Sequence, residues 1–448
     1  MFFSCTLATI QFEGRSLFLF VMLGFCLVMV FSRRKIRFCP SILVNFLFLS
    51  SVFSAVSSCF SDVPASYQKA AVVMAIYDLI LYFAAAYLFD LLKVDREKIL
   101  RVIRRAFLAG CILQLVWVPL QYVTYHYMDL DLNQLIFVDT LHLMEEASFI
   151  RANVYYPSGF TWHSALLAPM FVLAFALYDN VWIRALILFD AMICGNSTAL
   201  IGTVFCAALL ALAWVGRNWH RHVVRRSTVI SLLVLAVVGV TALVGLGMLD
   251  TLWTAFTKVW TRLFTENKDA STRAHLGYYA DYFTVAKDMP LMQLVFGYGI
   301  GCSGWPITEM RDRYTDLANW AVECDIVNIA LSRGVVGFIS YYFFLFYTAI
   351  RGLKINYKYF VVILSFFLQG FGYNIQWEYV VLIEIILLFT ILLDIDFFGS
   401  AKPAQGQTKT VFDTGEQPYE TAGQHCCYDI SQSESAGTGH CVDPGTGL

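Results

Sequence analysis

Long runs of apolar residues constrain the fold of this chain more than any motif does. A helix that crosses a lipid bilayer needs roughly 20 mainly apolar residues. Runs of about that length occupy residues 16–32, 39–60, 69–92, 106–125, 158–178, 228–248, 325–350 and 378–395. Of the 448 residues, 58% are hydrophobic and only 14% are charged, which excludes a soluble domain. We therefore expect a polytopic membrane protein.

Two further regions predict shorter spans. Residues 181–215 are too long for one span and are interrupted by Gly-Asn-Ser at 195–197, which predicts two short helices that meet at an outer turn. Residues 357–372 form a short apolar run that ends in glycines. By the length rule, the sequence predicts an all-α transmembrane bundle of about 11–12 spans.

Lysine and arginine residues cluster in the loops on one side of this predicted bundle. The clusters lie within residues 33–37, 93–105, 217–226 and 351–358. Cytoplasmic loops carry an excess of Lys and Arg, so we expect these four loops in the cytoplasm. Segments 126–157 and 249–322 then lie outside.

Composition divides the chain into two parts. Residues 1–400 are expected to form the transmembrane domain, which includes the large outer loop 249–322. Residues 401–448 are rich in Gly, Thr, Ser, Gln and Pro, which predicts a disordered cytoplasmic tail. The cysteines and histidines of this tail match no zinc-ligand spacing, so we expect no metal site.

The polar stretch from Thr251 to Glu323 holds most of the residues that could carry chemistry. It contains Arg273, His275 and the glycine run at 297–301. Glu323 stands where this stretch re-enters the membrane, and a carboxylate there is expensive unless it is used or paired.

Two pairs of residues leave alternatives open. Cys302 and Cys324 lie in or beside the outer loop, where they could form a disulfide or remain separate thiols. Asp78 and Asp190 lie well inside predicted spans. We interpret both carboxylates as polar contacts between helices, the alternative being an ion pathway.

Three ordered segments resemble the bacterial O-antigen polymerase and ligase superfamily of membrane glycosyltransferases. They are RANVYYPSGFTWHSA (151–165), CGNSTALIG (194–202), and the stretch from Ser271-Thr272-Arg273 through FGYGIG (296–301) to ECDIVNIALSRGVVGF (323–338). The resemblance covers roughly residues 145 to 345 and includes a large outer loop between the second and third segments.

This resemblance implies transfer of a glycan from undecaprenyl diphosphate to a sugar hydroxyl at the periplasmic face of the bacterial inner membrane. It implies no nucleotide, metal or other cofactor. The expected partners are lipid-linked glycans, the bilayer, a chain-length regulator and a flippase, and no nucleic acid. Within the superfamily we favour a polymerase of lipid-linked repeat units. The alternatives are a ligase that modifies lipid A core and, from another class, a secondary transporter.

The candidate catalytic residues are Arg151, Arg273 and Glu323. A guanidinium binds phosphate oxygens bidentately and stays charged, so the two arginines could hold the diphosphate. Alternatively, both could simply reach toward lipid headgroups. In the ligase branch the position of Glu323 is usually a His followed by Asn, and the Glu here favours a polymerase. Glu323 could accept the proton of the attacking hydroxyl, or could merely stabilise a helix N-terminus.

Five further residues are candidates for contacts with the sugars. Aromatic and polar side chains near the predicted site could stack on sugar faces or hydrogen-bond to them, and those in question are His163, His275, Tyr278, Tyr279 and Asn328. A histidine at such a position can equally be a solvated surface group.

The topology yields the first prediction. A cysteine introduced within 262–320 should react with a membrane-impermeant reagent added from outside, because this loop is expected in the periplasm. Cysteines introduced within 93–105 or 216–227 should stay protected until the membrane is opened. Protection of the 262–320 segment from the external reagent would contradict both the topology and the mechanism that depends on it.

Overall fold

The computed structural model describes the chain in segments. The described residues are 11–12, 15–33, 37–143, 150–151, 154–161, 163–218, 257, 270–311, 322–376 and 378–399. The predicted span at 228–248 and the predicted tail at 401–448 lie outside them.

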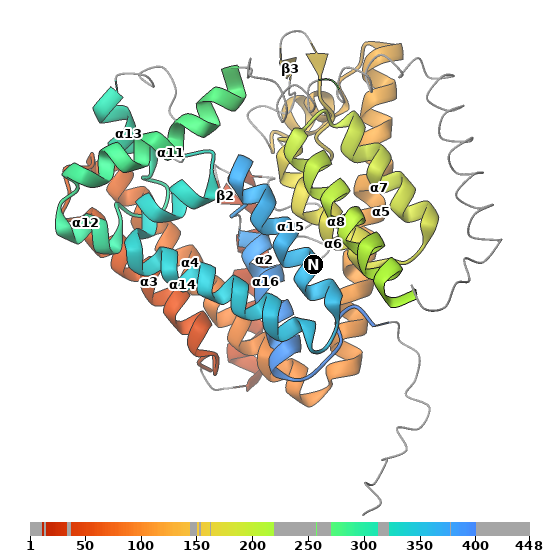
Figure 1. Ribbon diagram of the computed structural model, residues 1–448, viewed down its shortest axis with the longest axis horizontal. Coiled ribbons are helices and arrows are strands. Elements are labelled where there is room, and N and C mark those ends of the chain that lie inside the picture. The colour runs from red at the N-terminus through yellow and green to blue at the C-terminus, as the bar shows by residue number, and fades with distance from the viewer. Residues whose placement is uncertain are drawn as a thin grey trace, which may run out of the picture. The chain divides into compact units, whose positions relative to one another are not determined.

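Helices dominate the described part of the chain (Figure 1). The helices are α2 (Leu17–Arg33), α3 (Ile42–Ser58), α4 (Ala65–Val94), α5 (Arg96–Met128), the π-helix η1 (Gln134–Thr140), the 3-10 helix η2 (Ser164–Leu167), α6 (Ala168–Leu177), α7 (Val181–Ile193), α8 (Ser197–Asn218), α11 (Ala270–Asp288), α12 (Leu291–Phe296), α13 (Gly304–Arg311), α14 (Asp325–Leu353), α15 (Tyr357–Gly372) and α16 (Glu378–Leu392). Two small antiparallel hairpins accompany them, β1 (Gln11–Phe12) with β2 (Arg15–Ser16) and β3 (Ile150–Arg151) with β4 (Val154–Tyr155).

Several of these helices have the length and composition of membrane spans. Four are long and apolar enough to cross a bilayer, namely α4, α5, residues Ser197–Trp214 of α8, and α14. Shorter apolar helices of 10–17 residues are α2, α3, η2 with α6, α15 and α16. Large apolar side chains are exposed on these helices, for example Val116 of α5 and Phe343 of α14. Such a surface suits lipid rather than water, and the chain is a helical membrane protein.

The predicted runs that the structure describes coincide with helices, but several boundaries differ. The run predicted from residue 106 begins at Arg96 in α5, and the run predicted from residue 69 begins at Ala65 in α4. The predicted interruption at 195–197 is confirmed as the turn between α7 and α8, where Gly195 adopts φ +60°. The run at 158–178 is helical only from Ser164 onward. The reason is local, because the side chains of Gln121 and Gln114 accept hydrogen bonds from the backbone N–H groups of Gly159 (2.7 Å) and Phe160 (2.8 Å). These bonds hold a turn where a helix was expected.

The core is built around α6, α14 and α15. Every residue of α6 is buried, as expected of a helix that is apolar on all sides. α6 packs against α8 and α15, and α14 packs against α15, α3 and α12. The long helix α14 therefore connects the buried centre of the bundle to the segments derived from the predicted outer loop.

α14 contains a sharp break at Gly334. This residue has φ 63° and ψ −170°, a region of backbone space that essentially only glycine enters. A side chain would not fit either, because a Cβ at Gly334 would lie 2.4 Å from the carbonyl oxygen of Val295. Both the backbone conformation and the close approach thus require glycine.

The glycine run at 297–301 supplies hydrogen bonds at this break. Carbonyl groups just before the break lose their usual partners in the next helical turn, and backbone groups in lipid must find partners within the protein. The N–H of Tyr298 donates to the carbonyl of Leu331 at 2.8 Å, and the N–H of Gly299 donates to that of Ser332 at 3.0 Å. The run therefore completes the hydrogen bonding of the broken helix.

The break yields a second prediction. Gly334→Ala should lower the free energy of unfolding by at least about 1–3 kcal/mol, since it forces a strained backbone conformation and adds a clash. Gly24→Ala in α2 is the matched control, because nothing lies within 4 Å of a Cβ there. Thermal unfolding of the purified proteins in detergent measures the difference. An unchanged melting temperature for Gly334→Ala would contradict the break.

Candidate functional site

The helices of the predicted outer segment pack onto the beginning of α14. α11 contacts α13 and α14, and α12 contacts α14 and α3. In Figure 1, α11, α12 and α13 lie together on one part of the bundle. The candidate residues whose side chains the structure describes gather around the start of α14 and the end of α15.

His275 and Glu323 face each other in this region. Nε2 of His275 lies 3.7 Å from Oε2 of Glu323, and their side chains are 20% and 39% exposed. Glu323 stands two residues before α14 begins, where the helix dipole favours a negative charge. The imidazole is also in edge-to-face contact with Tyr278, with ring centroids 6.1 Å apart. The structure thus joins a predicted catalytic residue to two predicted sugar contacts.

The hydroxyl group of Tyr279 makes two hydrogen bonds within the protein. This hydroxyl donates to the carbonyl of Phe371 at 3.0 Å and accepts from the thiol of Cys324 at 3.0 Å. Burial and the bond to Cys324 raise the pKa of Tyr279, so the phenol stays neutral. Its predicted contact with sugar would have to be made by the ring, and this role stays a prediction.

Asn328 is held by a residue that the sequence did not single out. The hydroxyl of Ser303 donates to Oδ1 of Asn328 and accepts from the backbone N–H of Val322 at 2.9 Å. Ser303 is fully buried and follows directly after the glycine run and Cys302. A single serine next to glycines gives no sequence signal strong enough to predict this bridge.

His163 is a buried helix cap at the edge of the same region. Its Nδ1 accepts from the N–H of Ala165 at 3.1 Å at the start of η2. The imidazole stacks on Tyr373, just after α15, with ring centroids 5.2 Å apart and an interplanar angle of 19°. These contacts explain the burial of His163 structurally, and its predicted role in substrate binding is not tested by them.

For the two arginines predicted to bind the diphosphate, the structure describes the backbone. Arg273 lies in α11, two residues before His275, and Arg151 lies in β3, where it pairs with Val154. Both side chains lie outside the part that the structure describes. The hairpin of Arg151 is attached near the end of α5 through Tyr155, whose hydroxyl donates to Asp131 at 3.4 Å.

The possibility of a disulfide between Cys302 and Cys324 is wrong. Both thiols are free and fully buried, and they belong to different apolar clusters. Cys302 donates to the carbonyl of Tyr67 at 3.3 Å, whereas Cys324 contacts Tyr279. The glycine run places Cys302 against α4, away from the cluster that contains Cys324.

Asp78 forms the predicted contact between helices. Its Oδ2 lies 3.0 Å from Nη2 of Arg333, and the two side chains are 21% and 19% exposed. It also accepts a hydrogen bond from Ser51 of α3. Asp190 is fully buried, but neither of its oxygens has a hydrogen-bond partner among the described residues. The polar contact predicted for Asp190 is therefore not found in the described part of the chain.

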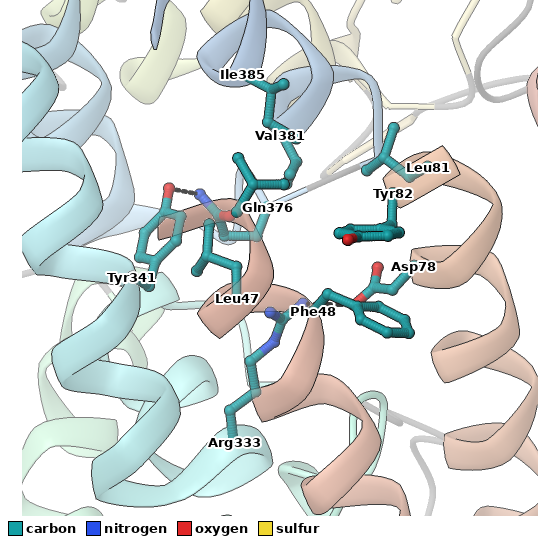
Figure 2. Close-up of a pocket in the computed structure, with 11 residues that line it drawn as sticks. Leu47, Phe48, Asp78, Leu81, Tyr82, Arg333, Tyr341, Gln376, Val381 and Ile385 are labelled. Atoms are coloured by element: carbon teal, nitrogen blue, oxygen red, sulfur yellow. Dashed lines mark hydrogen bonds and ion pairs between the residues drawn. The ribbon is translucent and has the colours of Figure 1, made fainter. Parts of the chain in front are cut away.

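The Asp78–Arg333 ion pair lines a cavity between α3, α4, α14 and α16 (Figure 2). Figure 2 shows Arg333 directed toward Asp78 on one side, with Gln376 and Tyr341 joined by a hydrogen bond on the other. Apolar side chains complete the lining, namely Val44, Leu47, Phe48, Leu81, Val381 and Ile385, together with Tyr82. Tyr341 also donates to the buried carboxylate of Glu384 at 3.0 Å. This mainly apolar cavity, with an ion pair in its lining, was not predicted from the sequence.

No protein-family model and no curated protein matches this chain. Among the described residues, no group of three or more His, Cys, Asp or Glu side chains is arranged to hold a metal ion. The arrangement at the start of α14 combines a partly exposed carboxylate, an imidazole and aromatic rings. Such a set of groups can accept a proton from a hydroxyl group and contact a sugar.

The buried thiols yield a third prediction. Burial raises the pKa of Cys302 to about 12, so at pH 8 only about one molecule in 10⁴ carries the reactive thiolate at this position. Maleimide should label native Cys302 very slowly. As long as the pH stays below the pKa, each increase of one pH unit should raise the labelling rate about tenfold. Exposed Cys59 is the control and should react readily. Equal labelling rates, or an intact mass that shows a disulfide, would contradict the assignment.

Proposed function

We propose that this protein polymerises oligosaccharide repeat units linked to undecaprenyl diphosphate into a surface polysaccharide. It acts at the periplasmic face of the bacterial inner membrane, in a bundle of about 11–12 spans with segment 249–322 on the periplasmic side. The observation that carries this proposal is the partly exposed Glu323–His275 pair at the start of α14. The resemblance in ordered motifs supplies the substrate class.

The reaction is a glycosyl transfer with a lipid diphosphate as leaving group. A hydroxyl oxygen of the sugar at the non-reducing end of a new lipid-linked unit attacks the anomeric carbon of the growing chain. The bond between this carbon and the diphosphate oxygen breaks, and its electron pair leaves with undecaprenyl diphosphate. The hydroxyl proton goes to Glu323. The diphosphate already activates the donor, and therefore no nucleotide or other cofactor is invoked.

Glu323 is suited to the role of proton acceptor by its position. It is 39% exposed, so a substrate hydroxyl can approach it, and it lies outside the apolar part of α14. A neutral His275 at 3.7 Å can take the proton from the carboxylic acid once glycosyl transfer is complete. In this scheme Glu323 activates the acceptor, and His275 restores the carboxylate for the next transfer.

Arg273 is the better placed of the two arginines proposed to bind the diphosphate. Two residues of α-helix span only about 3 Å along the axis, so the backbone of Arg273 lies within one helical turn of His275. Two residues of an α-helix differ by about 200° around its axis, so in this proposal Arg273 neutralises charge on the leaving group from another face of α11 than the one that carries His275. Arg151 contributes from the β3–β4 hairpin in the same proposal.

A secondary transporter is the second candidate, and a specific observation favours it. Transporters often place their binding sites at discontinuous helices near the middle of the membrane. The break at Gly334 and the Asp78–Arg333 ion pair fit that description. The partly exposed Glu323–His275 pair has no evident use in transport, and for this reason polymerisation remains our main proposal.

The fourth prediction tests the carboxylate. With synthetic repeat units on undecaprenyl diphosphate, and with chelator present and nucleotide absent, purified Glu323→Gln should polymerise about 10²–10⁴-fold more slowly than wild type, since a general base contributes that much. Glu323→Asp should retain part of the activity because its charge survives. Glu97→Gln is the matched control, as Glu97 is also an acid at a helix start, in the first turn of α5. It should leave the rate unchanged.

Three results would contradict this proposal. Long polymer made by Glu323→Gln would remove Glu323 from the mechanism. A wild-type protein that makes no polymer but modifies lipid A core would be a ligase. Substrate-driven accumulation of a solute in proteoliposomes, without polymer, would identify a transporter.

A further inference from the structure

The Asp78–Arg333 ion pair lies between two candidate membrane spans, α4 and α14, away from the Glu323–His275 pair, and its side chains are 21% and 19% exposed. Arg333 immediately precedes the break at Gly334, and Asp78 lies near the middle of α4. Charged groups at such depth are expensive, and those that persist are paired and functional. Replacing an ion pair inside a protein by well-packed apolar side chains is often neutral or stabilising, so general stability alone does not explain this pair. Its position at the break therefore needs an explanation.

The break divides α14 into two segments, and the shorter one carries the candidate site. Residues 325–333 follow directly on Glu323 and include Asn328. Three contacts fix the outer end of this segment. Ser303 bonds Asn328, Tyr279 bonds Cys324, and the carboxylate of Asp325 accepts from the N–H of Ile375 at 2.9 Å.

The inner end of segment 325–333 is fixed at the break. The glycine run holds its last carbonyl groups, those of Leu331 and Ser332, by two backbone hydrogen bonds. Those two bonds attach the end of segment 325–333 to the glycine run, which is itself a loop. The hydrogen bond from Nη2 of Arg333 to Asp78 joins this end of the segment to a long helix, α4. Ser51 of α3 bonds the same carboxylate oxygen, so three helices meet at Asp78.

A small movement at the break would displace the catalytic carboxylate. Glu323 is ten residues from Arg333, which corresponds to about 15 Å along a helix. A tilt of about 5° at the break would therefore move Glu323 by about 1.3 Å over that length. A misplacement of about 1 Å in an active site can lower the rate about 10²-fold.

We propose that Asp78 and Arg333 are positioning residues: their ion pair fixes the direction of segment 325–333 at the Gly334 break and thereby holds Glu323 in its working position. This inference rests on the proposed function of Glu323. Asp78 and Arg333 touch no substrate in this scheme. They act through the helix segment that Arg333 ends.

The kinetic test uses Asp78→Asn, together with the double variant Asp78→Asn/Arg333→Gln, which leaves no unpaired charge in the membrane. Both should lower kcat about 10–100-fold with KM for the acceptor unchanged, because the base is misplaced while substrate contacts remain. In a Glu323→Gln background, Asp78→Asn should cause little further loss, since the base it positions is already absent. Losses that multiply, or a wild-type kcat in both variants, would overturn the proposal.

A matched control is available on the same helix. Arg37 forms an ion pair of the same 3.0 Å length with Asp90, which lies in α4. This pair is more exposed than the Asp78–Arg333 pair and lies far along α4 from Asp78. Arg37→Gln should leave kcat unchanged, and its effect should simply multiply with that of Glu323→Gln. A loss of kcat in Arg37→Gln equal to that in Asp78→Asn would show a general effect of ion pairs and would contradict a positioning role.

A second readout separates this inference from the proposed function. Cys324 is fully buried at the outer end of the segment, and Cys206 of α8 is equally buried elsewhere. In proteins that keep only one of these thiols, Asp78→Asn should increase maleimide labelling of Cys324 but not of Cys206. This result would stand even if the wild-type protein polymerised nothing, in which case only the proposed function would fail. Cys324 that remains as protected as in wild type would overturn the positioning role.

Discussion

Lipid offers no hydrogen-bond partners, and this constraint governs the structure around Gly334. A helix that breaks inside the membrane must bring other donors to the carbonyl groups that it frees. Here the donors are Tyr298 and Gly299, which requires the segment that contains the glycine run to fold back against α14. The same chain path then places Cys302 against α4 and Ser303 beside Asn328. The candidate site thus depends on hydrogen bonds that a continuous α14 would not need.

Two carboxylates, each beside a basic side chain, illustrate how environment divides structural from chemical roles. Asp78 and Arg333 lie on two candidate membrane spans, α4 and α14, and bond at 3.0 Å. Glu323 and His275 lie 3.7 Å apart just before α14 begins, where the carboxylate is 39% exposed. The first pair is suited to fix a helix, because its groups are already committed to each other. The second is suited to proton transfer, because its contact is loose and partly exposed.

The sequence predicted what depends on local pattern and missed what depends on pairing. Span lengths and the turn at Gly195 follow from apolar runs and from glycine. The sequence places Asp78 inside a predicted span, but its partner Arg333 lies 255 residues away, and one sequence carries no information on such pairs. The helix expected from residue 158 starts only at Ser164, because distant glutamines of α5 bond the preceding turn. Likewise, the sequence placed His275 and Glu323 in the same polar stretch but did not predict that their side chains lie close together.

The central claim is that the start of α14, held by the Gly334 break, is where a lipid-linked glycan reacts. An electron cryo-microscopy structure of the protein bound to a non-hydrolysable lipid-linked donor and an acceptor unit tests this claim most directly. We predict the acceptor hydroxyl within hydrogen-bond distance of Glu323 and the diphosphate beside Arg273. Ligand density in the cavity next to Asp78 and Arg333, with none at Glu323, would contradict the claim.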